Sequence, residues 1–222
     1  MNSNKLKELK TRLKLTHQQK NIIIGTLLGD SCLRKSGAKV PLYNLKFEQK
    51  IGSRLYIEFL YDIFRDWCGT EPRIRHITGG GAENRESVCF ATYGHLSFTF
   101  YADVFYRIDS LTNKRRKVVP KLIHRWLNAE TVAMWFMDDG SKERSGYYLN
   151  TQGFTLKENE RLADALGKAF KFEVNIHTDN NKKTGKKGFR LYITANSRDD
   201  FTKLVKPFVL PCFHYKLHGV SS

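Results

Sequence analysis

The feature that most constrains the fold of this chain is a weak internal repeat, which divides its 222 residues into two halves. Each half begins with an apolar helix that ends in an acidic residue, IIIGTLLGD in the first and VAMWFMDD in the second. Each half then alternates strands and helices in the same order and closes on a basic segment. Self-similarity of this kind indicates that one supersecondary unit is built twice. We therefore predict two structural halves, residues 1–120 and 121–222.

The spacing of matching positions supports the repeat. Asp30 and Asp139 are 109 residues apart, whereas Lys117 and Lys216 are 99 residues apart. Loops of different length in the two halves would produce this drift. The shared order of elements therefore makes coincidence a poor explanation.

The predicted strands alternate between apolar and polar residues. In the segment FRLYIT, Phe189, Leu191 and Ile193 share one face, and Arg190 and Tyr192 share the other. This period of two predicts antiparallel sheets with one buried and one solvated face. The solvated faces are expected to carry long side chains that can form hydrogen bonds: Lys46, Arg73, Arg75, His177, Arg190 and Tyr192.

The charge of the chain indicates a polyanionic partner. Lys and Arg number 38 and Asp and Glu number 22, which leaves a net charge of +16. Such an excess favours nucleic acid or an anionic membrane surface. Strands can enter the major groove of DNA, where Arg, Lys, Asn and Gln side chains read base edges. The basic faces of the predicted sheets therefore favour nucleic acid over a membrane.

Two carboxylates stand at the ends of the two apolar helices. Asp30 and Asp139 would each face the negative end of a helix dipole, which is unfavourable unless a cation lies nearby. A hard divalent cation such as Mg²⁺, bound by one or two carboxylates and phosphate oxygens, would offset the repulsion. Gly25 and Gly29 share a helical face and would let the second helix approach closely near Ala133. The alternative is two solvated carboxylates that merely follow two core helices.

Lys117 and Lys216 occupy matching places late in each half. A lysine beside a reacting phosphate can stabilise its charge, although surface lysines would give the same pattern. The chain has neither an HExxH zinc motif, nor a phosphate-binding GxxxxGK[ST] loop, nor a GxSxG nucleophile elbow. Zinc hydrolase, nucleotide-driven and serine hydrolase chemistries thus lack sequence support.

The motifs IIGTLLGDS at 23–31 and VAMWFMDDG at 132–140, with NTQGFT, KVVP and the terminal YKL, resemble those of the LAGLIDADG homing endonucleases. The resemblance is to the single-chain, two-repeat, intron-encoded type, and it extends from about Lys10 to Leu217. It implies an α/β (α+β) fold, a pseudo-two-fold saddle of two αββαββα halves. Antiparallel sheets in these halves would straddle one long, asymmetric site on double-stranded DNA.

The resemblance also implies a mechanism. One phosphodiester bond in each DNA strand would be hydrolysed with a divalent metal, Mg²⁺ or Mn²⁺, leaving short 3′ overhangs. It assigns metal binding to the acidic motif ends and to two backbone carbonyls, and a catalytic role to two lysines: Asp30, Asp139, the carbonyls of Gly29 and Asp138, and Lys117 and Lys216. DNA contacts are expected from residues on the strands and adjoining loops: Lys46, Arg73, Arg75, Gln152, Lys186, Lys187, Arg190 and Tyr192.

Two positions depart from the family pattern. The first motif ends in Ser31 instead of Gly, which is tolerable if the backbone there does not need a positive φ. Lys46 lies on a strand where relatives often carry an amide such as Gln. Lys46 would then contact a phosphate instead of joining a water network.

The sequence predicts a monomer that acts on DNA inside the cell, in a bacterial or archaeal cytoplasm or in an organelle. One alternative is a maturase or other non-catalytic nucleic-acid-binding member of the family, with intron RNA as its partner. Another is a membrane-surface protein that uses the basic segment from Lys5 to Leu15. That segment has no Trp or Phe anchor, so we expect no membrane partner.

Overall fold

A computed structural model describes residues 8, 11–36, 42–77, 85–110, 112–180, 185 and 187–220. The chain forms two compact units. The first comprises Asp30–Ala102 with the described residues up to Lys20, and the second comprises Asn21–Gly29 with Asp103–Ser222. These two units are defined by how the chain packs, so they do not test the predicted boundary between the sequence repeats. The boundary at residue 120 stays a prediction.

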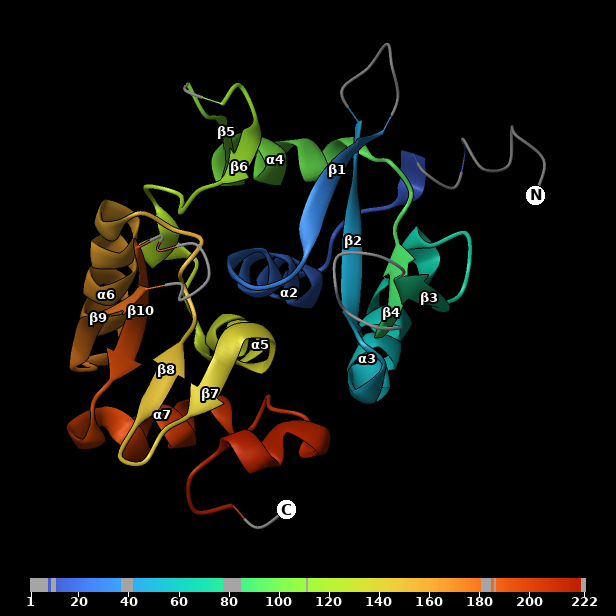
Figure 1. Cartoon of the computed structure of the whole chain (residues 1–222). Helices are drawn as coiled ribbons and strands as arrows, with labels where there is room; N and C mark the ends of the chain where they lie inside the picture. Colours follow the sequence, from blue (N-terminus) through green and yellow to red (C-terminus); the bar gives the residue numbers. More distant parts are fainter. Residues whose placement is uncertain are drawn as a thin grey trace. The chain divides into compact units, whose positions relative to one another are not determined.

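The order of elements is αββαββα in each half, which confirms the predicted order (Figure 1). The first half contains α2 (His17–Leu28), β1 (Cys32–Ser36), β2 (Leu42–Lys50), α3 (Arg54–Phe64), β3 (Arg73–Ile77), β4 (Arg85–Ala91) and α4 (Thr99–Phe105). The second half contains α5 (Ala129–Asp139), β7 (Gly140–Lys142), β8 (Tyr147–Leu149), α6 (Leu156–Phe170), β9 (Val174–Asn180), β10 (Lys187–Ile193) and α7 (Arg198–Val205). A short hairpin joins the halves, β5 (Tyr106–Ile108) with β6 (Arg115–Lys117).

Each half contains one four-stranded antiparallel sheet, and the two sheets have equivalent strand orders. These orders are β1-β2-β4-β3 and β7-β8-β10-β9. Lys46 lies opposite Ala91 in the first sheet, and Arg190 lies opposite His177 in the second. The predicted α/β architecture with antiparallel sheets is therefore confirmed.

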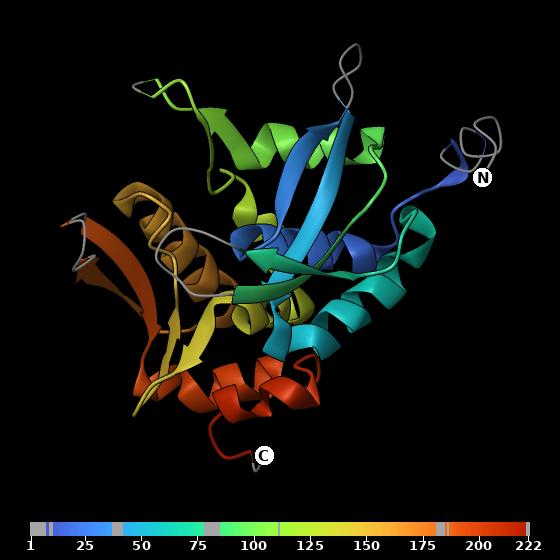
Figure 2. The same cartoon turned by 45° about the vertical axis from the view of Figure 1, so that its right-hand side comes forward.

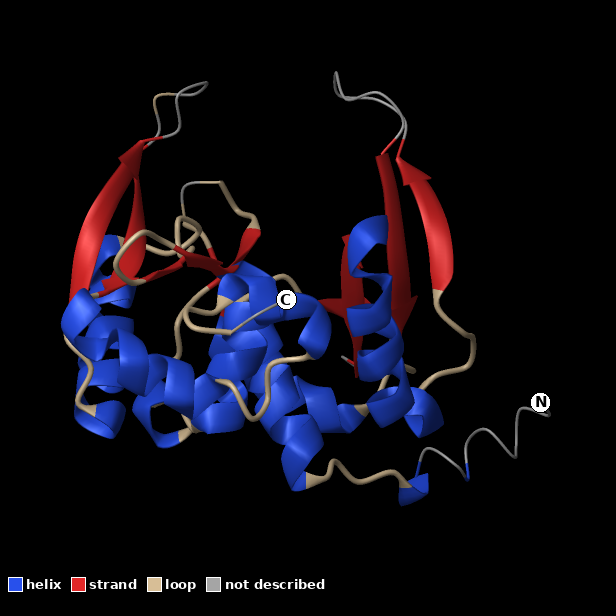
Figure 3. Ribbon diagram, turned by 90° about the horizontal axis from the view of Figure 1, so that it is seen from below, coloured by secondary structure: helices blue, strands red, loops and turns tan. Residues whose placement is uncertain are grey.

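Helices cover one face of each sheet. In the first unit α3 runs along the sheet (Figure 2), and its Phe64 ring lies 5.4 Å from the ring of Phe47. In the second unit α6 packs along β9 and β10, and the rings of Phe136 and Tyr147 lie 5.3 Å apart. Figure 3 shows this separation of helices and strands by colour. Burial of these aromatic side chains, together with the aliphatic residues around them, stabilises each core.

Burial along the strands follows the predicted alternation in β10 but not in β4. Leu191 and Ile193 are fully buried, while Arg190 on the opposite face is partly exposed. In β4 four consecutive residues, Ser87 to Phe90, are buried, including Cys89 on the polar face. Its partners across the ladder are Glu48 and Arg73, whose longer side chains stand on either side of this small residue. We attribute the burial of Cys89 to these longer neighbours.

Within the described part of the chain, no helix has both the length and the apolar character needed to cross a membrane.

Candidate active site and nucleic-acid surfaces

The two motif helices pack against each other within the second unit, because residues 21–29 of α2 belong to it together with α5. A Cβ atom at Gly25 would overlap the carbonyl oxygen of Thr131 and lie 2.7 Å from Cβ of Met134. A Cβ atom at Gly29 would lie 2.5 Å from Cβ of Asp138. The predicted close approach at the two glycines is therefore confirmed, and it extends to the ends of the motifs.

Polar contacts join the other ends of the same two helices. The Asn21 amide donates to the Glu130 carboxylate at 2.8 Å, and the Asn128 amide donates to Oδ1 of Asn21 at 2.9 Å. Asn128 also caps α5 by accepting from the backbone N–H of Thr131. Such an N-cap satisfies a donor that the first helical turn would otherwise leave open. The two motif helices are thereby held in register along their length.

Asp30 is exposed and directly follows α2 and Gly29. The side-chain amide of Gln49, near the end of β2, donates to Oδ2 of Asp30 at 2.7 Å. Sequence reasoning missed Gln49, because it expected the amide position at Lys46 and found lysine there. The amide lies three residues further along the same strand, and the presence of a glutamine on that strand was the signal that could have found it.

Asp139 ends α5 and is half-buried. The backbone N–H and the side-chain amide of Asn150 both donate to the Asp139 carbonyl, at 2.9 and 2.8 Å. Gly140, which follows, has no room for a Cβ atom because the ring of Phe136 fills that space. Ser31 occupies the matching position of the first motif and does not have a positive φ, which is why a non-glycine residue is tolerated there.

The two matched lysines both reach the carbonyl end of a motif helix. The Lys117 ammonium donates to the carbonyl of Gly29, and the Lys216 ammonium donates to the carbonyl of Met137 at 2.7 Å. The C-terminal end of a helix carries partial negative charge, so cations are stabilised there. The internal repeat therefore places one positive charge at the end of each motif.

The donors at the motif ends are suited to a hard cation. They are carboxylates and main-chain carbonyls, the oxygen ligands that Mg²⁺ prefers. Among the residues that the structure describes, no group of three or more His, Cys, Asp and Glu side chains is placed to hold a metal. Binding by the motif ends would therefore need the backbone carbonyls as well. The Lys117 contact shows that the Gly29 carbonyl attracts positive charge, and Lys216 donates to the carbonyl of Met137, the residue before Asp138.

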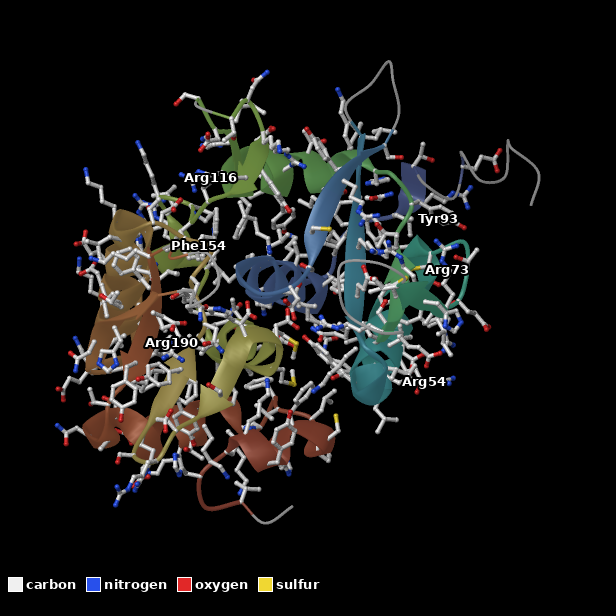
Figure 4. The ribbon with its side chains drawn as sticks, viewed as in Figure 1. Arg54, Arg73, Tyr93, Arg116, Phe154 and Arg190 are labelled. Atoms are coloured by element: carbon white, nitrogen blue, oxygen red, sulfur yellow. The ribbon has the colours of Figure 1, made fainter. Side chains whose placement is uncertain are left out.

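The polar face of the first sheet contains a charge cluster around Glu48. The Lys46 ammonium pairs with Glu48, and Ser87 and Arg75 also reach this carboxylate, at 2.7 and 3.3 Å. Burial alone would raise the pKa of Glu48, but the hydrogen bonds from Lys46 and Ser87 outweigh it and lower that pKa. Only 9% of the Lys46 side chain is exposed. The Lys46 charge is therefore directed at Glu48, while Arg73 on β3 is exposed (Figure 4).

An aromatic cluster lies on the polar face of the second sheet. The Arg190 guanidinium lies 4.1 Å from the centroid of the Tyr148 ring, a stacked arrangement that restricts its rotation (Figure 4). The His177 and Tyr192 rings are stacked at 5.0 Å, and the Tyr148 hydroxyl lies 2.9 Å from Nδ1 of His177. This face thus presents flat rings and a restrained guanidinium.

Two further predicted contact residues, Gln152 and Lys187, belong to the second unit. The Gln152 amide donates to Oδ2 of Asp179 at 2.8 Å, and Arg190 lies 3.5 Å from the same oxygen. Lys187 is exposed on β10. Lys186 lies outside the described residues.

Comparisons with known proteins agree with this geometry. Residues 20–201 match the LAGLIDADG DNA endonuclease family. The DNA endonuclease I-ChuI of Chlamydomonas applanata is 31% identical over 216 residues, which cover 92% of this chain and 96% of that protein. The cytochrome b mRNA maturase bI2 of Saccharomyces cerevisiae is 29% identical over 202 residues, or 89% of this chain and 46% of the maturase.

Solved structures show the same fold. The homing endonuclease I-WcaI, bound to its DNA recognition sequence, is 24% identical and superimposes with a TM-score of 0.84, over 99% of this chain and 95% of that one. I-DmoI in complex with DNA and Mn is 14% identical with a TM-score of 0.52, over 84% of this chain and 94% of that one. The repeated motifs, their packing and the extent of the family match together establish that the chain belongs to the LAGLIDADG DNA endonuclease family.

Proposed function

We propose that this chain is a monomeric, site-specific endonuclease that cuts both strands of a long asymmetric DNA site and leaves short 3′ overhangs. The observation that carries the proposal is the chemistry repeated at the two motif ends. Each motif ends in an acidic residue, and a lysine donates to a main-chain carbonyl of each motif, at Gly29 and at Met137. The 31% identity to a protein named as a DNA endonuclease, over nearly its whole length, supports the reaction class.

Asp30 and Asp139 would bind a divalent metal, Mg²⁺ or Mn²⁺, together with the backbone carbonyls of Gly29 and Asp138. When bound, such an ion supplies Lewis-acid stabilisation of the charge on phosphate oxygens. The name of the I-DmoI complex, which includes both DNA and Mn, supports a divalent metal in this fold. The oxygen donors of this chain fit that requirement.

The remaining chemistry belongs to side chains of the protein. Hydrolysis adds water across a phosphodiester bond, so negative charge builds on the phosphate oxygens in the transition state. Lys117 and Lys216 would stabilise that charge, because ammonium groups held in place are more effective than mobile ones. Gln49 would orient the Asp30 carboxylate through its 2.7 Å hydrogen bond. The polar faces of the two sheets would bind the DNA, with Arg73 and Arg190 among the contacts.

An RNA-splicing role is the second candidate. Two proteins named as cytochrome b mRNA maturases, from Saccharomyces cerevisiae and Debaryomyces hansenii, are 29% and 27% identical to this chain. The chain spans 46% of the length of the first. A maturase would need a basic surface for intron RNA, which a chain of net charge +16 can provide.

The proposal is tested by cleavage of a randomised duplex-DNA library with Mg²⁺, followed by sequencing of the ends. We expect wild-type protein to cut one recurrent long site. Asp30→Asn and Asp139→Asn should each abolish cleavage and leave DNA binding largely intact. Each substitution replaces a metal-binding carboxylate with an uncharged amide of nearly the same size. Asp164→Asn is the matched control, since Asp164 is an exposed carboxylate on α6 that pairs with Lys168.

Three results would separate the candidates. An Asp139→Asn protein that still cuts would contradict the assignment of the metal ligands. Wild-type protein that binds DNA without cutting it, and prefers structured intron RNA, would support the maturase function. Wild-type protein that neither binds nor cuts duplex DNA would contradict the endonuclease.

A further inference from the structure

The basic run KRRK at residues 114–117 divides its charges between the two faces of the hairpin formed by β5 and β6 (Figure 1). Side chains alternate along a strand, so Arg115 and Lys117 share one face and Arg116 lies on the other. The Lys117 ammonium donates to the carbonyl of Gly29. The face that carries Arg115 and Lys117 is therefore the one turned toward the end of the first motif helix.

Tyr106 stands directly opposite Lys117 on that face. In the next pair along the chain, the backbone N–H of Val118 donates to the Phe105 carbonyl at 2.8 Å. Hydrogen-bonded and non-hydrogen-bonded pairs alternate along an antiparallel ladder, so Tyr106 and Lys117 form a non-hydrogen-bonded pair. The Cβ atoms of two residues paired in this way lie about 4.5–5.5 Å apart, and their side chains interact. The Tyr106 ring therefore stands beside the aliphatic stem of Lys117.

The Tyr106 ring has a stacking partner of its own. The guanidinium carbon of Arg115 lies 3.6 Å from the centroid of the ring, within the range of a cation–π contact. Arg115 is exposed, whereas Tyr106 is half-buried. The contact restricts the orientation of the ring, and a ring with a fixed orientation limits the rotamers that are open to the neighbouring Lys117 stem.

An aromatic ring also lies beside the matched lysine of the second half. Lys216 ends the 3₁₀ helix η6 (Pro211–Lys216), three residues after Phe213. Side chains three residues apart are eclipsed in a 3₁₀ helix. The Lys216 ammonium accordingly lies 4.9 Å from the centroid of the Phe213 ring, and it donates to the Met137 carbonyl. The two halves thus place a ring beside a lysine with different local structures, a strand pair in one and a helical turn in the other.

A lysine at a motif end gains from such a neighbour because its side chain is flexible. The four-carbon stem has many rotamers, and an ammonium that must stay at one carbonyl loses most of them. A ring beside the stem removes part of this freedom before the substrate binds, and the face of the ring attracts the positive charge. A charged group that is already in position contributes more to the chemical step than one that must be ordered during it.

We propose that Tyr106 is a positioning residue for Lys117, and that Arg115 supports Lys117 by holding the Tyr106 ring. The inference rests on the proposed endonuclease function, in which Lys117 stabilises charge on a phosphate oxygen. Tyr106 would act only through Lys117. Phe213 would act in the same way on Lys216, but Phe213 is buried in the core, so the first half offers the cleaner test.

The test follows the cleavage of each strand of a duplex that carries the recurrent site recovered from the library, under single-turnover conditions. Lys117→Ala shows which strand depends most on Lys117. Tyr106→Ala should slow cleavage about tenfold to a hundredfold with the same strand bias, the cost of a misplaced catalytic group. DNA affinity, measured without divalent metal, should stay near that of the wild type. Tyr106→Phe should cut at close to the wild-type rate, because it keeps the ring.

Combined variants show whether Tyr106 acts through Lys117. Lys117→Ala/Tyr106→Ala should be no slower than Lys117→Ala, because the lysine that Tyr106 positions is then missing. Arg115→Ala should slow cleavage less than Tyr106→Ala, and it should have no effect in Tyr106→Ala protein. It removes a side chain from an exposed position, so it tests the stack even where Tyr106→Ala lowers stability. Arg107→Ala, an exposed arginine on the opposite face of the hairpin, is the matched control and should match the wild type.

Several outcomes would overturn the positioning role alone, in protein whose wild type cuts DNA. These are a Tyr106→Ala protein that cuts both strands at the wild-type rate, and rate losses that add in Lys117→Ala/Tyr106→Ala. A Tyr106→Phe protein as slow as Tyr106→Ala would also overturn it, because the ring would then not be the group that acts. A wild type that does not cut the duplex would instead overturn the endonuclease function itself.

Discussion

At the scale of single residues, the close packing of the two motif helices depends on two glycines, Gly25 and Gly29. Gly25 faces the backbone of Thr131, which has no freedom to move away from an added methyl group. A small residue is therefore required by helix packing at this position and not by backbone conformation. The same packing brings Gly29 against Asp138, next to the two acidic residues that we assign to metal binding.

Gly25→Ala should lower the free energy of unfolding by about 1–3 kcal/mol, the usual cost of overpacking a close contact. Chemical denaturation measures this change. Gly153→Ala is the control, because no atom lies within 4 Å of the Cβ that it would add and Gly153 does not have a positive φ. Equal stability of the two variants would contradict the close approach of the motif helices.

Gln49 connects the first sheet to a carboxylate that we assign to metal binding, that of Asp30. Its amide donates to Asp30, and hydrogen bonds to charged groups contribute about 1.5–3 kcal/mol. If that bond orients the carboxylate for catalysis, Gln49→Ala should slow single-turnover cleavage by about tenfold to a hundredfold. DNA affinity should stay near that of the wild type. Gln18→Ala, at an exposed position of α2, provides the control, and equal rates for both variants would exclude a role for Gln49.

At the scale of elements, the start of α6 holds strand β6, which carries Lys117. Thr155 and Glu158 form a capping box, and Glu158 also pairs with Arg116, next to Lys117. Burial alone would raise the pKa of Glu158, but hydrogen bonds from Thr155 and the charge of Arg116 outweigh it and lower that pKa. The folded state therefore favours the ionised carboxylate. The stabilisation is present above the ordinary glutamate pKa and is lost as the pH falls through the lowered value.

Glu158→Gln should accordingly be less stable than the wild type near neutral pH, by about 1–2 kcal/mol, because the variant loses the ion pair with Arg116 and its hydrogen bonds are no longer made to a charged group. The difference should shrink as the solution is acidified, because the wild-type carboxylate then becomes protonated. Denaturation midpoints over a pH series would show this convergence. Glu160→Gln changes an exposed carboxylate on the same helix and should show no comparable difference. A stability difference independent of pH would contradict the ionised role of Glu158.

At the scale of the whole molecule, the first motif helix contributes to two units. Residues 21–29 pack with the second unit, although they precede the first sheet in the chain. Ile22, Ile23 and Leu27 are fully buried, so much of the apolar surface of this helix is removed from water. The second unit is therefore incomplete without a segment that lies far upstream in the sequence.

A fragment of residues 103–222 should consequently melt at a lower temperature, or less cooperatively, than the full chain. A synthetic peptide that covers α2 should raise the melting temperature of the fragment, because ligands that bind only the folded state stabilise it. A peptide with the same composition in scrambled order should have no effect. A fragment as stable as the full chain would show that α2 is dispensable for the second unit.

Much of this protein follows from its sequence alone. The repeat, the order of elements, the alternation of β10 and the close approach at Gly25 and Gly29 depend on local periodicity and residue size, which a sequence displays directly. The matched spacing of Lys117 and Lys216 likewise predicted equivalent places for both. The structure does place them at corresponding ends of the two motif helices.

Other features were decided only by the tertiary structure. Lys46 was expected to face a phosphate, yet its charge is directed at Glu48, while the amide that meets Asp30 belongs to Gln49. A pocket beside the start of α6 is lined by residues from 104 to 161, and residues 21–29 complete a unit that otherwise begins at Asp103. These outcomes depend on which side chains meet after distant segments fold together. Sequence periodicity assigns a residue to a face of its own element, whereas its partner is set by the packing of other elements against that face.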